Sequence, residues 1–223
     1  MPVGTITPAE WQERTDPVSG VRLRQLTSYK TNNHHLYFTN PGWHAGGRRL
    51  LFGSERYNRS NLYSVDLESG EVTQLTDLEP PAKREVTFLS VSVNPTREEA
   101  YFSYGQELRA VDLATFGQRT LWTMPDGFRP SMLNCTADGK HVCVGIAEDL
   151  SHRIRTDMLR GYIGFRETFE AQPECHIVKV ATDGSGGESV WEEKCWIGHV
   201  NTSPTQADLL TFCHEGPWDR VNN

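Results

Sequence analysis

The chain has 223 residues, and its 22 Lys and Arg against 29 Asp and Glu give a formal net charge of −7. This charge argues against a protein that binds nucleic acid or another polyanion. Its longest apolar runs, such as residues 50–52, fall far short of the roughly 20 residues that a membrane helix needs, and residues 1–20 do not have the pattern of a signal peptide. We therefore expect a cytoplasmic protein without membrane segments.

The cysteines point to a reducing compartment. There are five, at positions 135, 143, 175, 195 and 213, and none of them forms a C-x-x-C pair. An odd number without that spacing indicates neither a disulfide framework nor a structural zinc site. Cys135, Cys143 and Cys213 lie in apolar, strand-like segments, so we expect them to be inert thiols.

A repeated pattern of short strands runs along the chain. Residues 20–27, GVRLRQLT, repeat the end of a unit at 70–76, GEVTQLT, and we expect them to form a last strand without earlier partners. Residues 41–76 contain strands at 50–52, 61–67 and 71–76, with a hairpin at Ser69 and Gly70. The unit recurs at 94–120, again at 136–184, and begins once more at Ser203.

The third unit carries an insertion at about 148–174. The apolar residues of the insertion fall near i, i+4, i+8 spacing, and this spacing predicts a helix or two. These residues are Leu150, Ile154, Met158, Leu159 and Ile163. The apolar face of such a helix needs a partner in the same subunit or in a neighbouring one.

Units of 40–50 residues with four short strands are typical of β-propeller blades, each of which buries both faces of its small sheet. The alternative is an ordinary β-sandwich whose internal similarity is accidental. We predict an all-β fold: a single propeller domain over residues 1–223, with about three and a half blades and a helical insertion. On this interpretation the domain is incomplete at its C-terminus, and the chain is the N-terminal part of a longer propeller.

Several phrases resemble a known family. The unit at 50–77 is similar to the TolB-type propeller repeat, which is specific for fold and weak for function. Three further phrases resemble the oligogalacturonate lyases: TDPVSGVRLRQLT, HHLYFTNPGW and, above all, WIGHVNTSPTQADLLTFCHEGPWDRV at 196–221. The resemblance covers nearly the whole chain. It implies a seven-bladed cytoplasmic propeller that cleaves short galacturonate oligomers by β-elimination in pectin catabolism.

The resemblance also implies a manganese ion. In that family its ligands are several His and a Gln, and we expect these and the catalytic base to lie beyond residue 223. The eight His of this chain form no H-x-H or H-x-x-x-H pair, so we expect no metal ligand here and an inactive fragment. An oligogalacturonate is the expected substrate, and the sequence carries no signal for an oligomeric state.

Five residues are candidates for substrate contact. His34 and Tyr37 lie in a phrase expected on the inner strand of a blade, beside Phe38, for which packing between blades is the expected role. His199 follows Gly198 at the start of the fourth unit, and His214 and Glu215 end the next strand, so these side chains are expected to converge at the channel mouth. A core histidine bonded to a backbone carbonyl is the alternative for His199.

Other polar residues are expected to be structural. Arg48, Arg49, Arg56 and Arg59 are expected in solvated turns, and Asp66 and Asp112 in the repeated V-D-L phrase are expected to form turns.

Two other function classes remain open on the sequence. The chain could be a non-catalytic TolB-type interaction module, or the propeller of a prolyl-peptidase-like hydrolase. The chain has no G-x-S-x-G elbow, G-x-G-x-x-G loop or Walker-type loop of its own.

Overall fold

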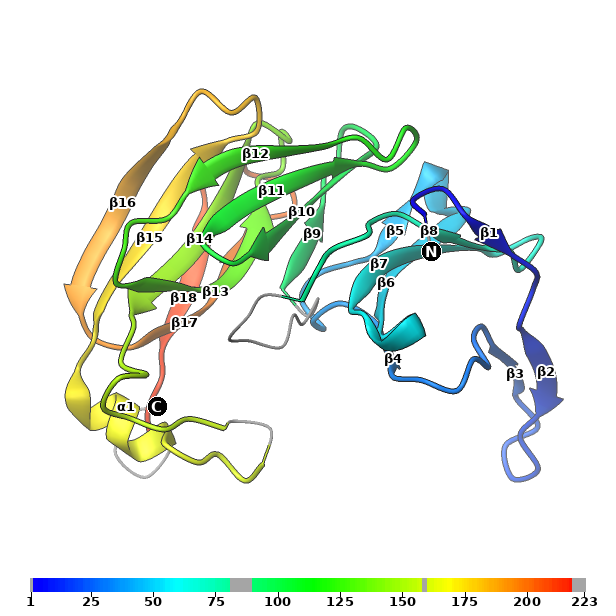
Figure 1. Ribbon diagram of the computed structural model, residues 1–223, viewed down its shortest axis with the longest axis horizontal. Helices are drawn as coiled ribbons and strands as arrows, with labels where there is room; N and C mark the ends of the chain where they lie inside the picture. Colours follow the sequence, from blue (N-terminus) through cyan, green and yellow to red (C-terminus); the bar gives the residue numbers. More distant parts are fainter. Residues whose placement is uncertain (1, 81–89, 158–159, 218–223) are drawn as a thin grey trace. The chain divides into compact units, whose positions relative to one another are not determined.

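The computed structural model describes residues 2–80, 90–157 and 160–217, and strands dominate it (Figure 1). The chain divides into two compact units. Unit 1 comprises Met1–Val93, Glu98–Ala100 and Val111–Gln118, and unit 2 comprises Asn94–Arg97, Tyr101–Ala110 and Arg119–Asn223.

The first sheet belongs to unit 1. Its antiparallel strands follow the order β1 (Ile6–Thr7), β8 (Val72–Gln74), β7 (Asn61–Asp66), β6 (Arg49–Ser54) and β4 (Asn33–His34), with β5 (Trp43–His44) also paired to β6. Two short 3-10 turns flank β6, at Ala45–Gly47 and Arg56–Asn58. Phe52, Tyr63, Val65 and Val72 form a buried cluster on this sheet.

Two further four-stranded sheets follow in the chain. One contains β9 (Val91–Val93), β10 (Glu99–Tyr104), β11 (Glu107–Asp112) and β12 (Gln118–Thr123), and the next contains β13 (Phe128–Cys135), β14 (His141–Glu148), β15 (Glu174–Ala181) and β16 (Gly187–Lys194). In both, neighbouring strands are consecutive in the sequence. A two-stranded sheet of β17 (Ile197–Thr202) and β18 (Leu210–His214) comes last.

The apolar residues of unit 2 are buried on both faces of its complete sheet. One cluster joins residues of β10 to β12 with residues of β13 to β15, including Tyr101, Leu108, Leu133 and Val144. A second cluster places Cys143 and Ile177 against Ile197 and Val200 of β17. Burial on both faces explains why the central strands β14 and β15 are rich in Val, Ile and Cys.

The V-D-L carboxylates form turns, as predicted. Asp66 Oδ1 accepts hydrogen bonds from the backbone N–H groups of Glu68 and Ser69. Asp112 Oδ1 accepts the equivalent pair from Ala114 and Thr115. In each of these two sequence repeats, an Asx turn of this kind fixes the hairpin between the last two strands.

Residues 20–27 differ from the expectation of a strand without earlier partners. β3 (Arg22–Gln25) pairs with β2 (Gln12–Thr15), and the turn between them repeats the Asx geometry, because Asp16 Oδ1 accepts from the N–H groups of Val18 and Ser19. The sequence pattern missed β2 because its residues, Gln-Glu-Arg-Thr, show no apolar alternation. Both strands are exposed throughout.

The insertion is helical only near its end. α1 (Phe165–Ala171) is its one helix among the described residues, and it lies within the predicted helical insertion at about 148–174. The apolar spacing at residues 150–163, on which that prediction rested, does not form a helix in the described part of that stretch. Leu150 is buried, and Ile163 forms a β-bridge with Asp157, while Met158 and Leu159 lie outside the described residues. Within the part of the chain that the structure describes, no helix has the length and apolar character to span a membrane.

Arg56 is buried, in contrast to the solvated turn expected from the sequence. Only 1% of its side chain is exposed, and its guanidinium pairs with the carboxylate of Glu10. It also lies over the rings of Tyr29 and Tyr63, at 4.9 and 5.5 Å from their centroids. The partner that makes this burial possible lies 46 residues away in the sequence, so no local pattern indicates it.

Candidate functional site

The β17–β18 pair carries three of the five candidate residues. Its register shifts between Gly198 and Asn201, which makes a bulge at His199 and Val200. Val200 is buried, and its side chain occupies space left by Gly145 on β14. His199 adopts a left-handed backbone conformation with φ of 49°, and such conformations in non-glycine residues are frequent at functional sites.

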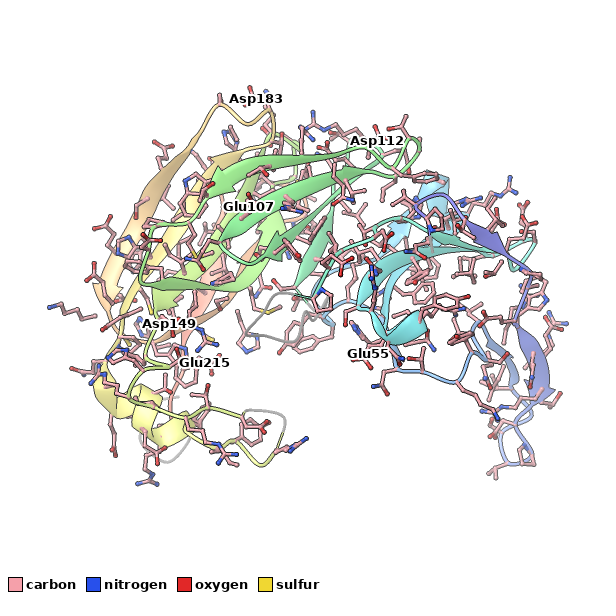
Figure 2. The ribbon with its side chains drawn as sticks, viewed as in Figure 1. Glu55, Glu107, Asp112, Asp149, Asp183 and Glu215 are labelled. Carbon is pink, nitrogen blue, oxygen red and sulfur yellow. The ribbon has the colours of Figure 1, made fainter. Side chains whose placement is uncertain are left out.

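His199 and Glu215 lie within ion-pair distance of each other. The distance from His199 Nε2 to Glu215 Oε1 is 3.0 Å, and the two side chains are 36% and 22% exposed. The structure thus brings these two predicted residues together at the end of β18, where Glu215 lies (Figure 2).

Gly198 makes room for the Glu215 side chain. A Cβ atom at this position would clash with Glu215 Oε1 and would lie 2.7 Å from its Cγ atom. The site therefore explains the Gly-His step of the sequence: the glycine leaves space for the carboxylate, and the imidazole of the next residue lies 3.0 Å from it.

Cys213 also belongs to this cluster. Its Sγ atom lies 3.5 Å from Glu215 Oε1. Burial, together with the nearby Glu215 carboxylate, raises the pKa of the Cys213 thiol to about 11. The sequence predicted apolar surroundings for this thiol, and the structure differs, because the side chain of Glu215, two residues along the chain, contacts it.

His214 has a different partner. Its Nε2 atom lies 2.6 Å from Glu193 Oε1 on β16, and its ring contacts Phe212 edge-on. The two histidines therefore lie next to different carboxylates. Glu193 was not among the site residues predicted from the sequence, because nothing in the pattern of the outer strand β16 indicates a functional role for it.

The remaining candidates belong to unit 1. His34 lies on β4, is half-buried, and has its Nδ1 atom 3.4 Å from the His35 carbonyl oxygen. Tyr37 is half-buried and contacts the ring of Phe38, with 4.3 Å between centroids. Phe38 is 81% exposed and lies in a turn, so the packing role expected for it is wrong in this chain.

A Ser-His-Glu arrangement in unit 1 bears on the hydrolase alternative. His44 Nε2 lies 2.8 Å from Ser64 Oγ, and His44 Nδ1 lies 3.1 Å from Glu98 Oε2. Ser64 and His44 are both buried, and burial lowers the pKa of His44 although the bond to Glu98 acts in the opposite direction. A nucleophile needs access to its substrate, so this group joins strands and does not form a hydrolytic site.

The whole chain matches one family model. The match covers residues 1–223, and the model describes oligogalacturonate lyase. A curated relative, the oligogalacturonide lyase of Pectobacterium atrosepticum, is 28% identical over 228 residues, which is all of this chain and 55% of the relative. The chain spans about half the length of the curated relatives that it matches.

Solved structures support the predicted fold. An oligogalacturonate lyase in complex with manganese superposes with a TM-score of 0.86 at 24% identity, covering 99% of this chain and 57% of that one. TolB from Acinetobacter baumannii gives 0.57 at 16% identity, covering 95% and 45%. These likenesses and the consecutive four-stranded sheets confirm the all-β propeller. Because the family model matches every residue of the chain, the chain belongs to the oligogalacturonate lyase family.

Proposed function

We propose that the full-length protein cleaves short galacturonate oligomers, saturated or unsaturated, by β-elimination in pectin catabolism. The observation that carries the proposal is the family match over all 223 residues, which includes the Gly-His and Cys-His-Glu-Gly-Pro phrases that build the His199–Glu215 pair. The five free thiols are consistent with a reducing, cytoplasmic setting.

β-Elimination makes definite demands on such a site. The proton at C5 of the sugar is α to a carboxylate, so a base must remove it while a cation or hydrogen-bond donors stabilise the enolate charge that develops. The bond from C4 to the bridging oxygen then breaks, a C4–C5 double bond forms, and the leaving oxygen takes a proton. Because the chain itself is acidic, a uronate needs local positive charge or N–H donors in order to bind.

His199 is the residue best placed to meet the sugar. Its side chain is partly exposed, and Glu215 fixes the orientation of its ring. An imidazole N–H held in this way can donate to a carboxylate or hydroxyl oxygen of the sugar. We propose His34, Tyr37 and His214 as further contacts, with Glu193 orienting His214 as Glu215 orients His199.

The proposal includes manganese, because a solved family member is in complex with this ion. Among the described residues, one cluster has metal-site spacing: His199, Cys213 and Glu215. Its thiol does not fit manganese, which prefers carboxylate, carbonyl and water oxygens. No step of the reaction is therefore assigned to manganese through these residues, and we expect its ligands elsewhere in the full-length protein.

The test is the activity of the full-length protein on digalacturonate and trigalacturonate. We expect manganese-dependent growth of the ultraviolet absorbance that a 4,5-unsaturated uronate gives. His199→Ala should lower kcat/KM about tenfold to a hundredfold, because a hydrogen bond to a charged group contributes about 1.5–3 kcal/mol, and should leave the melting temperature nearly unchanged. His152→Ala is the matched control, since His152 lies in an exposed turn of the insertion. A full-length protein that binds these oligomers without forming unsaturated product would contradict the proposal.

A further inference from the structure

The His199, Cys213 and Glu215 side chains offer three different ligand atoms at one point. The imidazole nitrogen, the sulfur and a carboxylate oxygen all lie within 4.8 Å of one another. Glu215 Oε1 is 3.0 Å from His199 Nε2 and 3.5 Å from Cys213 Sγ. Ligand atoms around a tetrahedral zinc ion, with bonds of 2.0–2.3 Å, lie roughly 3.3–3.8 Å apart. The cluster is therefore close to the required size without a backbone change.

The donor set selects a class of metal. A thiolate and an imidazole favour zinc and similar late divalent ions over magnesium, calcium and manganese. One thiolate and one carboxylate would balance the charge of a divalent cation, with the imidazole neutral. Three protein ligands with a fourth position left for water is the arrangement of many catalytic zinc sites.

Backbone features show that the arrangement is built into the fold. Gly198 leaves the space that Glu215 occupies, and the bulge after it sets His199 in a left-handed conformation facing the carboxylate. Cys213 lies directly across from Gly198 in the strand pairing. His199 lies on β17, Cys213 on β18 and Glu215 directly after β18, and the packing of β17 on β13 and β14 holds this strand pair in place.

We propose that His199, Cys213 and Glu215 bind a divalent cation of the zinc class, with a fourth position open to water or to an anionic ligand such as a carboxylate. This site is separate from the family's manganese, because its donors differ. It does not rest on the lyase proposal, because metal binding is measured without substrate. If the site is occupied during catalysis, the metal would supply the local positive charge that a uronate needs next to His199.

The experiment uses the full-length protein after removal of metals with a chelator. Cobalt(II), which replaces zinc and is coloured, is titrated in while the thiolate-to-cobalt charge-transfer band is recorded. We expect the band to saturate at one equivalent and to disappear when zinc is added. Cys213→Ser should abolish the band, and His199→Ala and Glu215→Gln should each weaken cobalt binding by at least about tenfold, since even indirect partners of metal ligands cost that much.

Cys195→Ser is the matched control, because Cys195 is the other half-buried cysteine and lies outside the cluster. It should leave the band unchanged. Circular dichroism of each variant checks the fold, and Cys213→Ala serves as a second variant if Cys213→Ser does not fold. The absence of a thiolate band in the unmodified protein, or a band that survives in the folded Cys213 variant, would overturn the proposal. If Cys213→Ser keeps manganese-dependent activity, the lyase proposal stands whether or not this metal site exists.

Discussion

The guanidinium of Arg56 joins the N-terminal segment to the first sheet. Its carboxylate partner, Glu10, also accepts hydrogen bonds from the backbone N–H groups of Ser28 and Tyr29. One carboxylate therefore ties together the segment before β2, the segment after β3 and the turn after β6. The rings of Tyr29, Phe52 and Tyr63 surround the cation and shield this link from water.

Removal of the Arg56 side chain should be strongly destabilising. Arg56→Ala leaves a carboxylate without its cation and opens space among three aromatic rings, so the free energy of unfolding should fall by about 3 kcal/mol. Urea unfolding of the full-length protein measures this loss. Arg14→Ala, on the exposed strand β2, is the control and should change stability by less than about 0.5 kcal/mol. If Arg56→Ala and Arg14→Ala lower the free energy of unfolding equally, the aromatic surroundings of Arg56 do not contribute to stability.

The same link predicts how stability depends on pH. Burial by itself raises the pKa of Glu10, but the hydrogen bonds from Arg56, Ser28 and Tyr29 outweigh it and hold the pKa below that of an ordinary glutamate. A carboxyl whose folded pKa is lowered stabilises the fold above its unfolded pKa, and this stabilisation is lost as pH falls through the folded pKa.

Glu10→Gln removes the titrating group, so its stability should depend less steeply on pH below about 4.5 than that of the unmodified protein. Chemical unfolding at a series of pH values down to the folded pKa checks this expectation. Glu68→Gln, at an exposed hairpin residue, is the comparison. Parallel stability curves for the unmodified protein and Glu10→Gln would contradict the assigned role.

At the scale of single elements, the strand pair β17–β18 depends on Gly198. Gly198→Ala puts a methyl group into the space of the Glu215 side chain, and overpacking of this kind costs about 1–3 kcal/mol. Gly117→Ala is a suitable control, because a Cβ atom there meets only Thr115 Oγ1 at an ordinary 3.5 Å.

A double-mutant cycle separates this clash from other effects of the substitution. Glu215→Ala removes the side chain that the new methyl group would meet, so Gly198→Ala should cost much less in the Glu215→Ala background than alone. Thermal unfolding of the four proteins gives the coupling energy. Additive losses would mean that Gly198 is needed for some reason other than the space it leaves for Glu215.

The elements also show what a sequence pattern can and cannot indicate. The hairpin at Asp66 and Gly70 was predictable, because the Asx turn lies within five residues and repeats at Asp112. The cluster around Glu215 was predictable only in part. Gly-His and Cys-His-Glu stand out in the sequence, but which side chain meets which depends on the strand register that sets Gly198 opposite Cys213 and on the bulge at His199. These are tertiary features, as is the 46-residue separation of Glu10 and Arg56.

At the scale of the whole molecule, the exposed surfaces of this chain bear on its solubility. The outer strand β16 ends the third sheet, and Val190 and Trp191 on it are exposed, as is Leu209 before β18. β18 pairs only with β17 in the part of the chain that the structure describes. Unpaired strand edges and apolar side chains in water are sites of association between molecules.

We therefore expect residues 1–223, expressed alone, to aggregate and to have little or no lyase activity, whereas the full-length protein should be monodisperse and active. The physical reason is that Trp191 is exposed and that β18 pairs only with β17 among the described residues. By contrast, β14 and β15 are flanked by strands of their own sheet, and neighbouring sheets cover their faces. Light scattering and the unsaturated-uronate absorbance measure the two properties on matched samples. Trp191→Glu should reduce the aggregation of the 223-residue chain, because it places a charge on the apolar edge. Robust turnover by a monodisperse 223-residue chain would show that its own residues complete the catalytic site.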